Sequence, residues 1–155
     1  MKEIRKDILL SEVLPLGWRI NYLANYYSLI ANRQLKRRFK TTRQEFVVLF
    51  CLANSANVTA ADVCEVCGRP KNTISRAVNS LLKKGYITSS PHPADARAEI
   101  LTLELAGKQL YDRIIMVFKD RDRAMMARLD EAECRTLKQL LDKMIEGFNP
   151  WSEEA

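Results

Sequence analysis

The amino-acid sequence predicts a mainly helical fold that carries one small β-hairpin. Along most of the chain, apolar residues recur at the three- and four-residue spacing of helices. Only between Tyr86 and Leu103 does the pattern change to the alternation of strands, around a proline-rich turn. The 155 residues, 47% of them hydrophobic, suffice for a single domain with one core. The expected order is four helices, two strands and two further helices.

The N-terminal region contains a predicted helix with two apolar stripes. One stripe consists of Leu16, Ile20, Leu23, Tyr27 and Ile30, and the other of Trp18, Tyr22, Tyr26 and Leu29. A helix that is apolar on two sides must be covered on both. We therefore expect one side to pack on its own domain and the other to face a partner chain or a ligand.

Two short helices are predicted in the middle of the chain. Residues 41–44 supply an N-cap candidate for the first, whose apolar residues continue to Leu52. Residues 54–57 are polar and turn-like, and Thr59 caps the second helix, which ends near Cys67. A third helix follows after a very short turn.

This third helix has one apolar and one polar side. Its inward residues are Ile74, Ala77, Val78, Leu81 and Leu82, and its outward residues are Lys71, Asn72, Thr73, Ser75, Arg76, Asn79 and Lys83. Arg and Asn side chains can pair with the edges of guanine and adenine, and Ser and Thr can donate to phosphates. Together with the preceding helix and the turn Gly68-Arg69-Pro70, it forms a helix-turn-helix candidate.

The predicted hairpin follows this helix directly. Residues 86–89 and 99–103 have the pattern of strands, and residues 91–95 form a turn cluster between them. Arg97 lies near the tip of this hairpin, which has the position of a wing. A wing beside a helix-turn-helix favours DNA binding much more strongly than the helix alone.

The distribution of charge favours the same partner. The chain has a net charge of +6, and residues 1–103 carry 16 Lys and Arg against 8 Asp and Glu. Residues 104–155 carry 9 against 11. The cations concentrate in residues 33–45 and 69–84. Clustered cations suit a polyanion because neutralised phosphates release counterions, although charge alone is equally compatible with a solvated basic face.

The C-terminal part of the chain predicts two more helices. A long one follows Gly107 and carries apolar residues along one side. The last begins near Glu131, and its apolar stripe consists of Cys134, Leu137, Leu141, Met144 and Phe148.

Several motifs together resemble the MarR family of regulators (multiple antibiotic resistance regulator type). They are residues 42–44, 73–87, 95–97 and 103–107, and the similarity covers roughly residues 18–148. The resemblance implies a single domain over residues 1–155, with a winged helix-turn-helix lobe at about 41–105. It also implies helical dimerisation regions at about 10–38 and 106–148, and a homodimer on double-stranded DNA with a pseudo-palindromic operator.

The resemblance also assigns roles to individual residues. Asp95 and Arg97 match the wing motif, in which the Arg enters the minor groove and the Asp steadies the wing. Ser75 and Arg76 match the recognition helix, whereas Ser89 stands where the family often has an Arg. The full set of expected DNA-binding residues is Arg43, Thr59, Lys71, Asn72, Thr73, Ser75, Arg76, Asn79, Lys83, Asp95 and Arg97.

Regulation by a small molecule is a further implication of the resemblance. Many such regulators are repressors that release DNA when an aromatic or phenolic acid binds between the dimer helices and the DNA-binding lobe. The candidate lining here is Trp18, Arg19, Tyr22, Tyr26 and Arg33. Interface packing is the alternative role of these side chains.

Other classes of protein receive less support. Cys64 and Cys67 have CxxC spacing, which indicates two small core residues, with a thiol-based redox sensor of the same fold as the alternative. A protein-interaction adaptor without DNA binding is opposed by the basic outer face. The chain has one His, His92, and no catalytic motif, so we expect no enzyme, metal or cofactor. Without a signal peptide or a long apolar run, a cytoplasmic location is expected.

Overall fold

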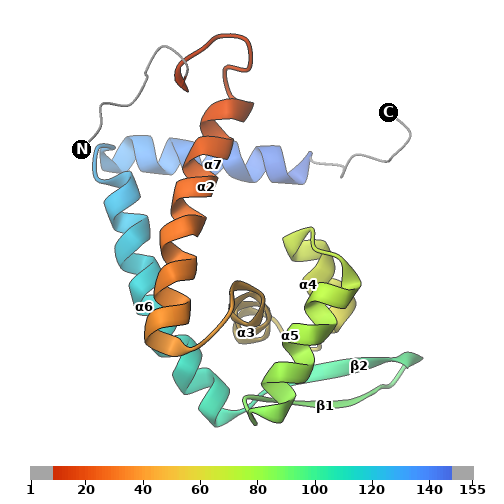
Figure 1. Ribbon diagram of the computed structural model, residues 1–155. Coiled ribbons are helices and arrows are strands. Elements are labelled where there is room, and N and C mark those ends of the chain that lie inside the picture. The colour runs from red at the N-terminus through yellow and green to blue at the C-terminus, as the bar shows by residue number, and fades with distance from the viewer. Residues whose placement is uncertain (1–8, 148–155) are drawn as a thin grey trace. The chain divides into compact units, whose positions relative to one another are not determined.

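The computed structural model describes residues 9–147, which form helices and one β-hairpin (Figure 1). The helices are α2 (Gly17–Gln34), the π-helix η1 (Leu35–Phe39), α3 (Arg43–Asn54), α4 (Ala60–Cys67), α5 (Lys71–Lys83), α6 (Leu105–Met126) and α7 (Glu131–Glu146). The hairpin consists of β1 (Ile87–His92) and β2 (Asp95–Leu103). The predicted fold class is therefore confirmed. Phe148, the last residue of the predicted C-terminal stripe, lies outside the described residues.

The chain divides into two compact units. The first extends to Phe118, and the second begins at Lys119 and contains the end of α6 and all of α7. A capping box opens α7, because the Glu133 N–H donates to Asp130 Oδ1 (2.8 Å) and the Asp130 N–H donates to Glu133 Oε2 (2.9 Å). Within the single chain, α7 has no buried residue: of its apolar stripe, Cys134 and Leu137 are half-buried, and Leu141 and Met144 are exposed.

The core of the first unit joins the helix-turn-helix to its neighbours. Its most deeply buried side chains are Leu35, Val48, Leu49, Val63, Ile74, Leu81, Ile87 and Ile114. They come from η1, α3, α4, α5, β1 and α6, so each element around the helix-turn-helix contributes. Burial of one such side chain contributes about 1.5–3 kcal/mol. The core thus fixes α5 relative to α3 and to the hairpin.

The two short helices start at threonine caps, as the sequence predicts. At α3, the Glu45 N–H donates to Thr42 Oγ1 (3.2 Å) and the Thr42 N–H donates to Glu45 Oε2 (2.7 Å). Thr59 and Asp62 form the same reciprocal pair at α4. Each box satisfies N–H groups that have no partner within the helix. Helix α4 ends at Gly68, which has a φ of +59°. Glycine adopts this left-handed conformation without steric cost.

The hairpin is longer than the sequence predicts and has an additional anchor. β1 continues to His92, and β2 already starts at Asp95, so pairing extends to the tip. An isolated bridge pairs Val58 with Leu101, whose N–H donates to the Val58 carbonyl (2.9 Å). Sequence analysis did not predict this bridge, which ties the wing to the chain between α3 and α4.

The base of the hairpin lies close to the first turn of α6. The Glu104 N–H donates to the Tyr86 carbonyl (3.0 Å). A Cβ atom on the buried Gly107 would overlap this same carbonyl oxygen and would meet a Leu103 methyl group at 2.9 Å. Only glycine permits so close an approach of helix and strand.

The helical N-terminal region contains a change of geometry that the sequence did not predict. After Gln34 the α-helix gives way to the π-helix η1, and the Thr41 N–H donates to the Leu35 carbonyl (3.2 Å). Lys40, just after η1, adopts a left-handed conformation with φ of 52°. The chain turns at this point from α2 toward the cap of α3.

Candidate nucleic-acid interface

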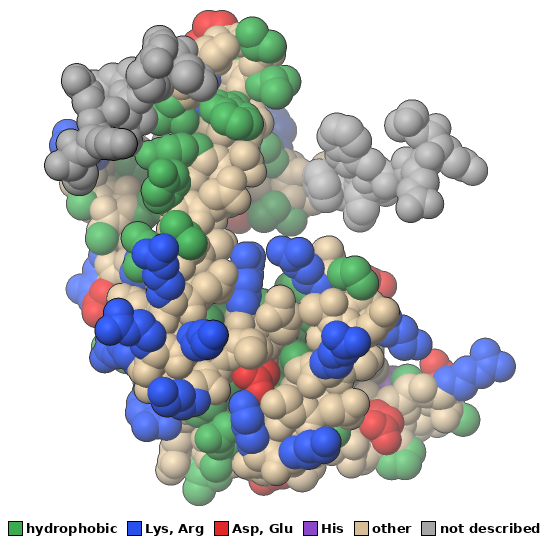
Figure 2. Space-filling view, in the orientation of Figure 1, with side chains coloured by type: hydrophobic (Ala, Val, Ile, Leu, Met, Phe, Trp, Pro, Cys, Tyr) green, Lys and Arg blue, Asp and Glu red, His purple; other side chains and the backbone are tan. Residues whose placement is uncertain are grey.

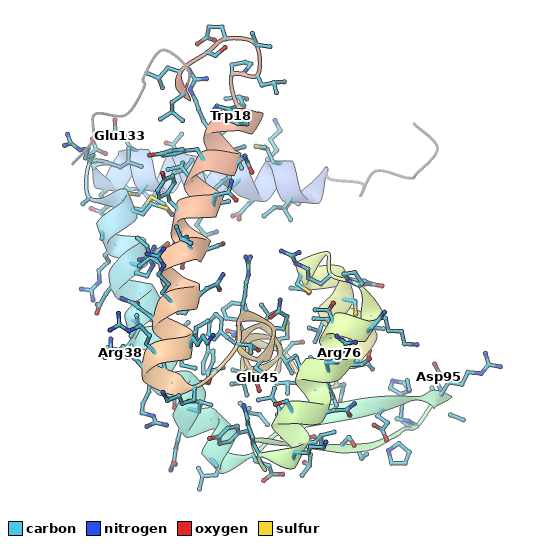
Figure 3. All side chains as sticks on the ribbon, in the orientation of Figure 1. Trp18, Arg38, Glu45, Arg76, Asp95 and Glu133 are labelled. Carbon is cyan, nitrogen blue, oxygen red and sulfur yellow. The ribbon has the colours of Figure 1, made fainter. Side chains whose placement is uncertain are left out.

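Helix α5 has the two-sided character that the sequence predicts. Its residues Ile74, Ala77, Val78 and Leu81 are buried, and Leu82 is half-buried. On the other side, Lys71, Asn72, Arg76, Asn79 and Lys83 are exposed, and Thr73 and Ser75 are half-buried. Arg76, labelled in Figure 3, comes from the middle of the helix. The polar side is therefore open to a ligand while the apolar side is held in the core.

The N-terminus of α5 differs from those of α3 and α4. Pro70 occupies the cap position and provides no side-chain cap, whereas α3 and α4 carry complete capping boxes. The first-turn N–H groups of a helix and its dipole favour an anion. Lys71 and Asn72 are exposed at the same turn. The start of α5 is thus suited to a phosphate group.

The wing tip presents one cation on a braced backbone. The Arg97 N–H donates to Asp95 Oδ1 (2.9 Å), and the Ala94 N–H donates to His92 Nδ1 (3.2 Å). The side chains of Asp95 and Arg97 are exposed, and Arg97 forms no ion pair with any acid in residues 9–147. The Asp95 contact supplies a physical basis for the steadying role that the resemblance assigns to it.

The N-terminus of α3 lies beside the polar side of α5. A hollow of about 300 Å³ is lined by Thr42, Gln44, Glu45, Thr73, Arg76, Ala77 and Ser80. Arg43, the first residue of α3, is exposed. In the sequence it lies between Thr42 and Gln44, which both line this hollow. The two helices therefore form one polar surface.

Glu45 connects these helices from below that surface, and sequence analysis did not single it out. It is 2% exposed, and its Oε1 atom accepts hydrogen bonds from Lys84 Nζ (2.5 Å) and Ser80 Oγ (2.7 Å). Its Oε2 atom accepts the hydrogen bond from the Thr42 N–H in the capping box of α3. The Thr-x-x-Glu spacing signals the cap, but nothing local in the sequence signals the contact with Lys84, 39 residues away.

The pKa of Glu45 reflects these contacts. Burial alone raises the pKa of the carboxyl. Hydrogen bonds from Lys84, Thr42 and Ser80 outweigh burial, together with the charge of Lys84, so the pKa lies below its ordinary value of 4.5. Glu45 is therefore ionised at neutral pH and forms a charged link between α3 and the end of α5.

Thr59 has a structural role in addition to any contact with a ligand. Its Oγ1 atom accepts the Asp62 N–H (3.3 Å) and donates to Asp62 Oδ2 (2.8 Å). The side chain is half-buried at the start of α4. Its hydroxyl hydrogen is thus already engaged within the protein.

Comparison with known proteins agrees with this arrangement. A model of the MarR family matches residues 39–98. The multiple antibiotic resistance protein MarR of Escherichia coli (strain K12) is 25% identical over 138 residues, which cover 88% of this chain and 95% of that protein. The crystal structure of a MarR/EmrR family transcriptional regulator from Acinetobacter sp. ADP1 has 26% identity and a TM-score of 0.72, over 83% of this chain and 91% of the other. The chain is therefore similar to MarR-family transcriptional regulators in sequence and in fold.

A second solved structure bears on the surface just described. It is a crystal structure of a mutant MarR from E. coli complexed with operator DNA, 25% identical to this chain with a TM-score of 0.71. The likeness covers 88% of this chain and 97% of the other. Among the described residues, no helix combines the length and apolar character that a membrane span requires.

The residues predicted to line an effector site lie on α2. The rings of Tyr22 and Tyr26 are 4.7 Å apart, and Trp18 and Arg33 are exposed. Arg19 contacts the carbonyls of Leu10, Ser11 and Pro15 and forms an ion pair with Glu12 (3.1 Å). Its guanidinium is therefore engaged by the segment that precedes α2.

A separate apolar hollow was not predicted from the sequence. Its volume is about 340 Å³, and it is lined by Arg43, Gln44, Phe46, Val47, Phe50, Val66, Cys67, Arg69 and Ile74. These residues come from α3, α4, α5 and the turn between α4 and α5. None of them belongs to the predicted effector set.

The four cysteines are free thiols, and the surroundings of two of them, Cys51 and Cys64, do not activate the thiol. Cys51 is buried, and Cys64 and Cys67 are half-buried. Burial raises the pKa of the Cys51 and Cys64 thiols, and the neighbouring Cys67 raises both further. A thiol that senses oxidants needs a lowered pKa, so this environment speaks against the redox alternative.

Proposed function

We propose that this chain binds double-stranded DNA sequence-specifically and acts as a transcriptional repressor. The observation that carries the proposal is the division of α5, whose apolar side is held in the core while its polar side is exposed from an N-terminus without a side-chain cap. The major groove of B-DNA admits one α-helix. Arg76 and Asn79 read base edges there, and Lys71 and Lys83 contact phosphates.

The wing and the start of α3 supply the remaining proposed contacts with DNA. Arg97 enters the minor groove, whose negative potential attracts Arg, and Asp95 holds the backbone of Arg97 in place. Arg43 contacts a phosphate beside the hollow between α3 and α5. The remaining members of the proposed DNA-binding set are Thr59, Asn72, Thr73 and Ser75.

A homodimer is part of the proposal. In the single chain, α2 leaves large apolar side chains uncovered, with Leu23 51% exposed and Tyr26 54% exposed. Uncovered apolar surface of this kind marks an interaction site, and a second copy of the chain would cover it. Two copies would place their α5 helices in successive major grooves about 34 Å apart, on a pseudo-palindromic operator.

Release by a small aromatic or phenolic acid is the proposed mode of regulation. The neighbouring Tyr22 and Tyr26 rings and the exposed Trp18 offer apolar contacts, and Arg33 offers a cation for the carboxylate. Arg19 is a weaker member of this set, because its guanidinium already contacts three carbonyls and Glu12.

The proposal is tested with a DNA duplex that the full chain selects from a random pool. Binding to this duplex and to a scrambled one is then measured by fluorescence anisotropy. We expect Arg76→Ala to weaken binding to the selected duplex by about 1–3 kcal/mol and to reduce the preference for it. Arg113→Ala is a matched control, because Arg113 is also exposed but lies on α6.

Two results would contradict the proposal at different points. Equal binding of the wild-type chain to selected and scrambled duplexes, or no binding to either, would refute sequence-specific recognition and favour the adaptor alternative. An equal loss for Arg76→Ala on both duplexes would show that Arg76 contacts only phosphate.

A further inference from the structure

A group of exposed cations lies outside the winged helix-turn-helix, where α2 ends. We call it the η1 cluster; it consists of Arg33, Lys36, Arg37, Arg38 and Lys40. All five side chains are exposed. Figure 2 shows Lys and Arg side chains gathered over the C-terminal end of α2, on the same face of the molecule as those over α5.

The charges of the η1 cluster are not neutralised within the described chain. The sequence has no Asp or Glu between residues 13 and 44, and no member of the cluster forms an ion pair with an acid of residues 9–147. The next acid, Glu45, is buried and bound to Lys84. Mutual repulsion of five uncompensated cations opposes folding, and a polyanion removes it.

Several cations on the other helices are paired with acids. Lys108 on α6 pairs with Asp112 (3.2 Å). On α7, Lys138 pairs with Asp142 (2.6 Å). These pairs have the i, i+4 spacing that is ordinary on solvated helix faces. The η1 cluster differs from these paired cations, because five cations follow one another there without an acid.

The local geometry holds the cluster in place. Leu35 is 1% exposed and anchors η1 in the core, and the half-buried Phe39 lies beneath the Arg38 guanidinium at 5.5 Å. The bond from the Thr41 N–H to the Leu35 carbonyl closes the last turn. An anchored backbone lowers the entropy that such side chains lose on binding. Single turns of π-helix are also frequent at functional sites.

The η1 cluster is next to the proposed DNA-binding surface. Two residues after Lys40, Thr42 lines the same hollow as Arg76 of α5. The exposed Arg43 continues the row of cations into α3. In the view of Figure 1, the end of α2 and the wing tip lie on opposite sides of α5.

We propose that the η1 cluster is a second phosphate-binding surface, which contacts the DNA backbone on the side of α5 opposite the wing. This inference rests on the proposed function, because α5 must first place the DNA. Lys and Arg contacts to phosphates carry no sequence information. The cluster therefore contributes affinity and salt dependence, and leaves the choice of sequence to α5 and the wing.

The test compares two variants that remove the same charge from different places. One is the triple variant Lys36→Gln, Arg37→Gln and Arg38→Gln; the control is Lys108→Gln, Arg113→Gln and Arg123→Gln on α6. Affinity for the selected duplex is measured between about 50 and 200 mM salt, where each phosphate contact contributes ~0.9 to the slope of log K against log salt. The η1 variant should lower the slope by roughly 2–3 per protomer and should keep the preference over scrambled DNA. The control should keep the wild-type slope.

Single substitutions and a map of phosphate contacts show whether the triple variant loses phosphate contacts or simply misfolds. Lys36→Gln and Arg37→Gln alone should each lower the slope by about 0.9. Ethylation interference should show phosphates that the wild-type chain needs and the triple variant does not, in addition to the phosphates that Lys71, Lys83 and Arg43 are proposed to contact. Specific binding by the wild type with an unchanged slope in the η1 variants, or an equal change in the control, would overturn this inference alone. A wild-type chain that selects no duplex would overturn the proposed function, and the inference with it.

Discussion

Replacing Glu45 by glutamine removes the charge that joins α3 to α5 and keeps the size of the side chain. The carboxylate accepts hydrogen bonds from Lys84, Ser80 and the Thr42 N–H, and it is 2% exposed. Glutamine has only one acceptor oxygen for these donors. A net contribution of about 1.5–3 kcal/mol is typical of a hydrogen bond to a charged group, and breaking a buried ion pair costs about 3–5 kcal/mol.

The expected decrease in the free energy of unfolding lies toward the lower end of these values. The Lys84 side chain is 39% exposed, so its ammonium group can turn to water when its partner is lost. We expect Glu45→Gln to lower the free energy of unfolding at neutral pH by about 2–3 kcal/mol. Urea denaturation followed by circular dichroism measures this difference. Glu99→Gln is the control, because Glu99 is exposed on β2, and its effect should stay within about 0.5 kcal/mol.

The pH dependence provides a separate check on the cause. The pKa of Glu45 in the folded protein lies below the ordinary value of 4.5 that applies to the unfolded chain. The charge therefore stabilises the fold fully above this value, and the stabilisation is lost as the pH falls through the lowered pKa. The gap between wild type and Glu45→Gln should narrow on acidification below 4.5. The reasoning would be refuted if the two proteins had the same free energy of unfolding at neutral pH, or if the difference between them did not change on acidification.

Two further predictions concern the base of the wing and the effector. Gly107→Ala should destabilise the fold by about 1–3 kcal/mol, because the new Cβ would overlap the Tyr86 carbonyl; Gly17→Ala, with no atom within 4 Å, should be neutral or slightly stabilising in thermal unfolding. Salicylate-like acids should quench the fluorescence of Trp18 and weaken binding to the selected duplex, and a broad aromatic panel without effect would argue against an aromatic effector.

The parts of the site that lie within one helix could be predicted from the sequence. Helical periodicity is a local property, so the inward and outward sides of α5 were identified correctly. The threonine caps of α3 and α4 carry their acid partner three residues later, within the same local window. The hairpin ends were less predictable, because Pro91 pairs within β1 where the sequence indicated a turn.

Contacts between distant segments could not be predicted in the same way. Lys84 and Glu45 are 39 residues apart, and the bridge from Val58 to Leu101 likewise joins separate elements. Neither contact has a periodic signal, because both depend on how α3 and α5 pack in the core. The π-helix could not be predicted from the sequence for a related reason. The burial of Leu35 and the position of Thr42 decide where α2 ends.

On the proposed function, the bridge between Val58 and Leu101 has a consequence for the kind of DNA that this chain would select. The bridge ties the wing to the segment before α4, and α5 shares a core with β1, so the helix and the base of the wing belong to one packed body. Such a body holds its major-groove and minor-groove contacts at a constant separation along the double helix. Duplexes that are overwound or underwound between the two contacts must deform to fit, and the energy of deformation depends on their sequence. On the proposed function, the protein would therefore discriminate by helical twist at base pairs that none of its side chains touches.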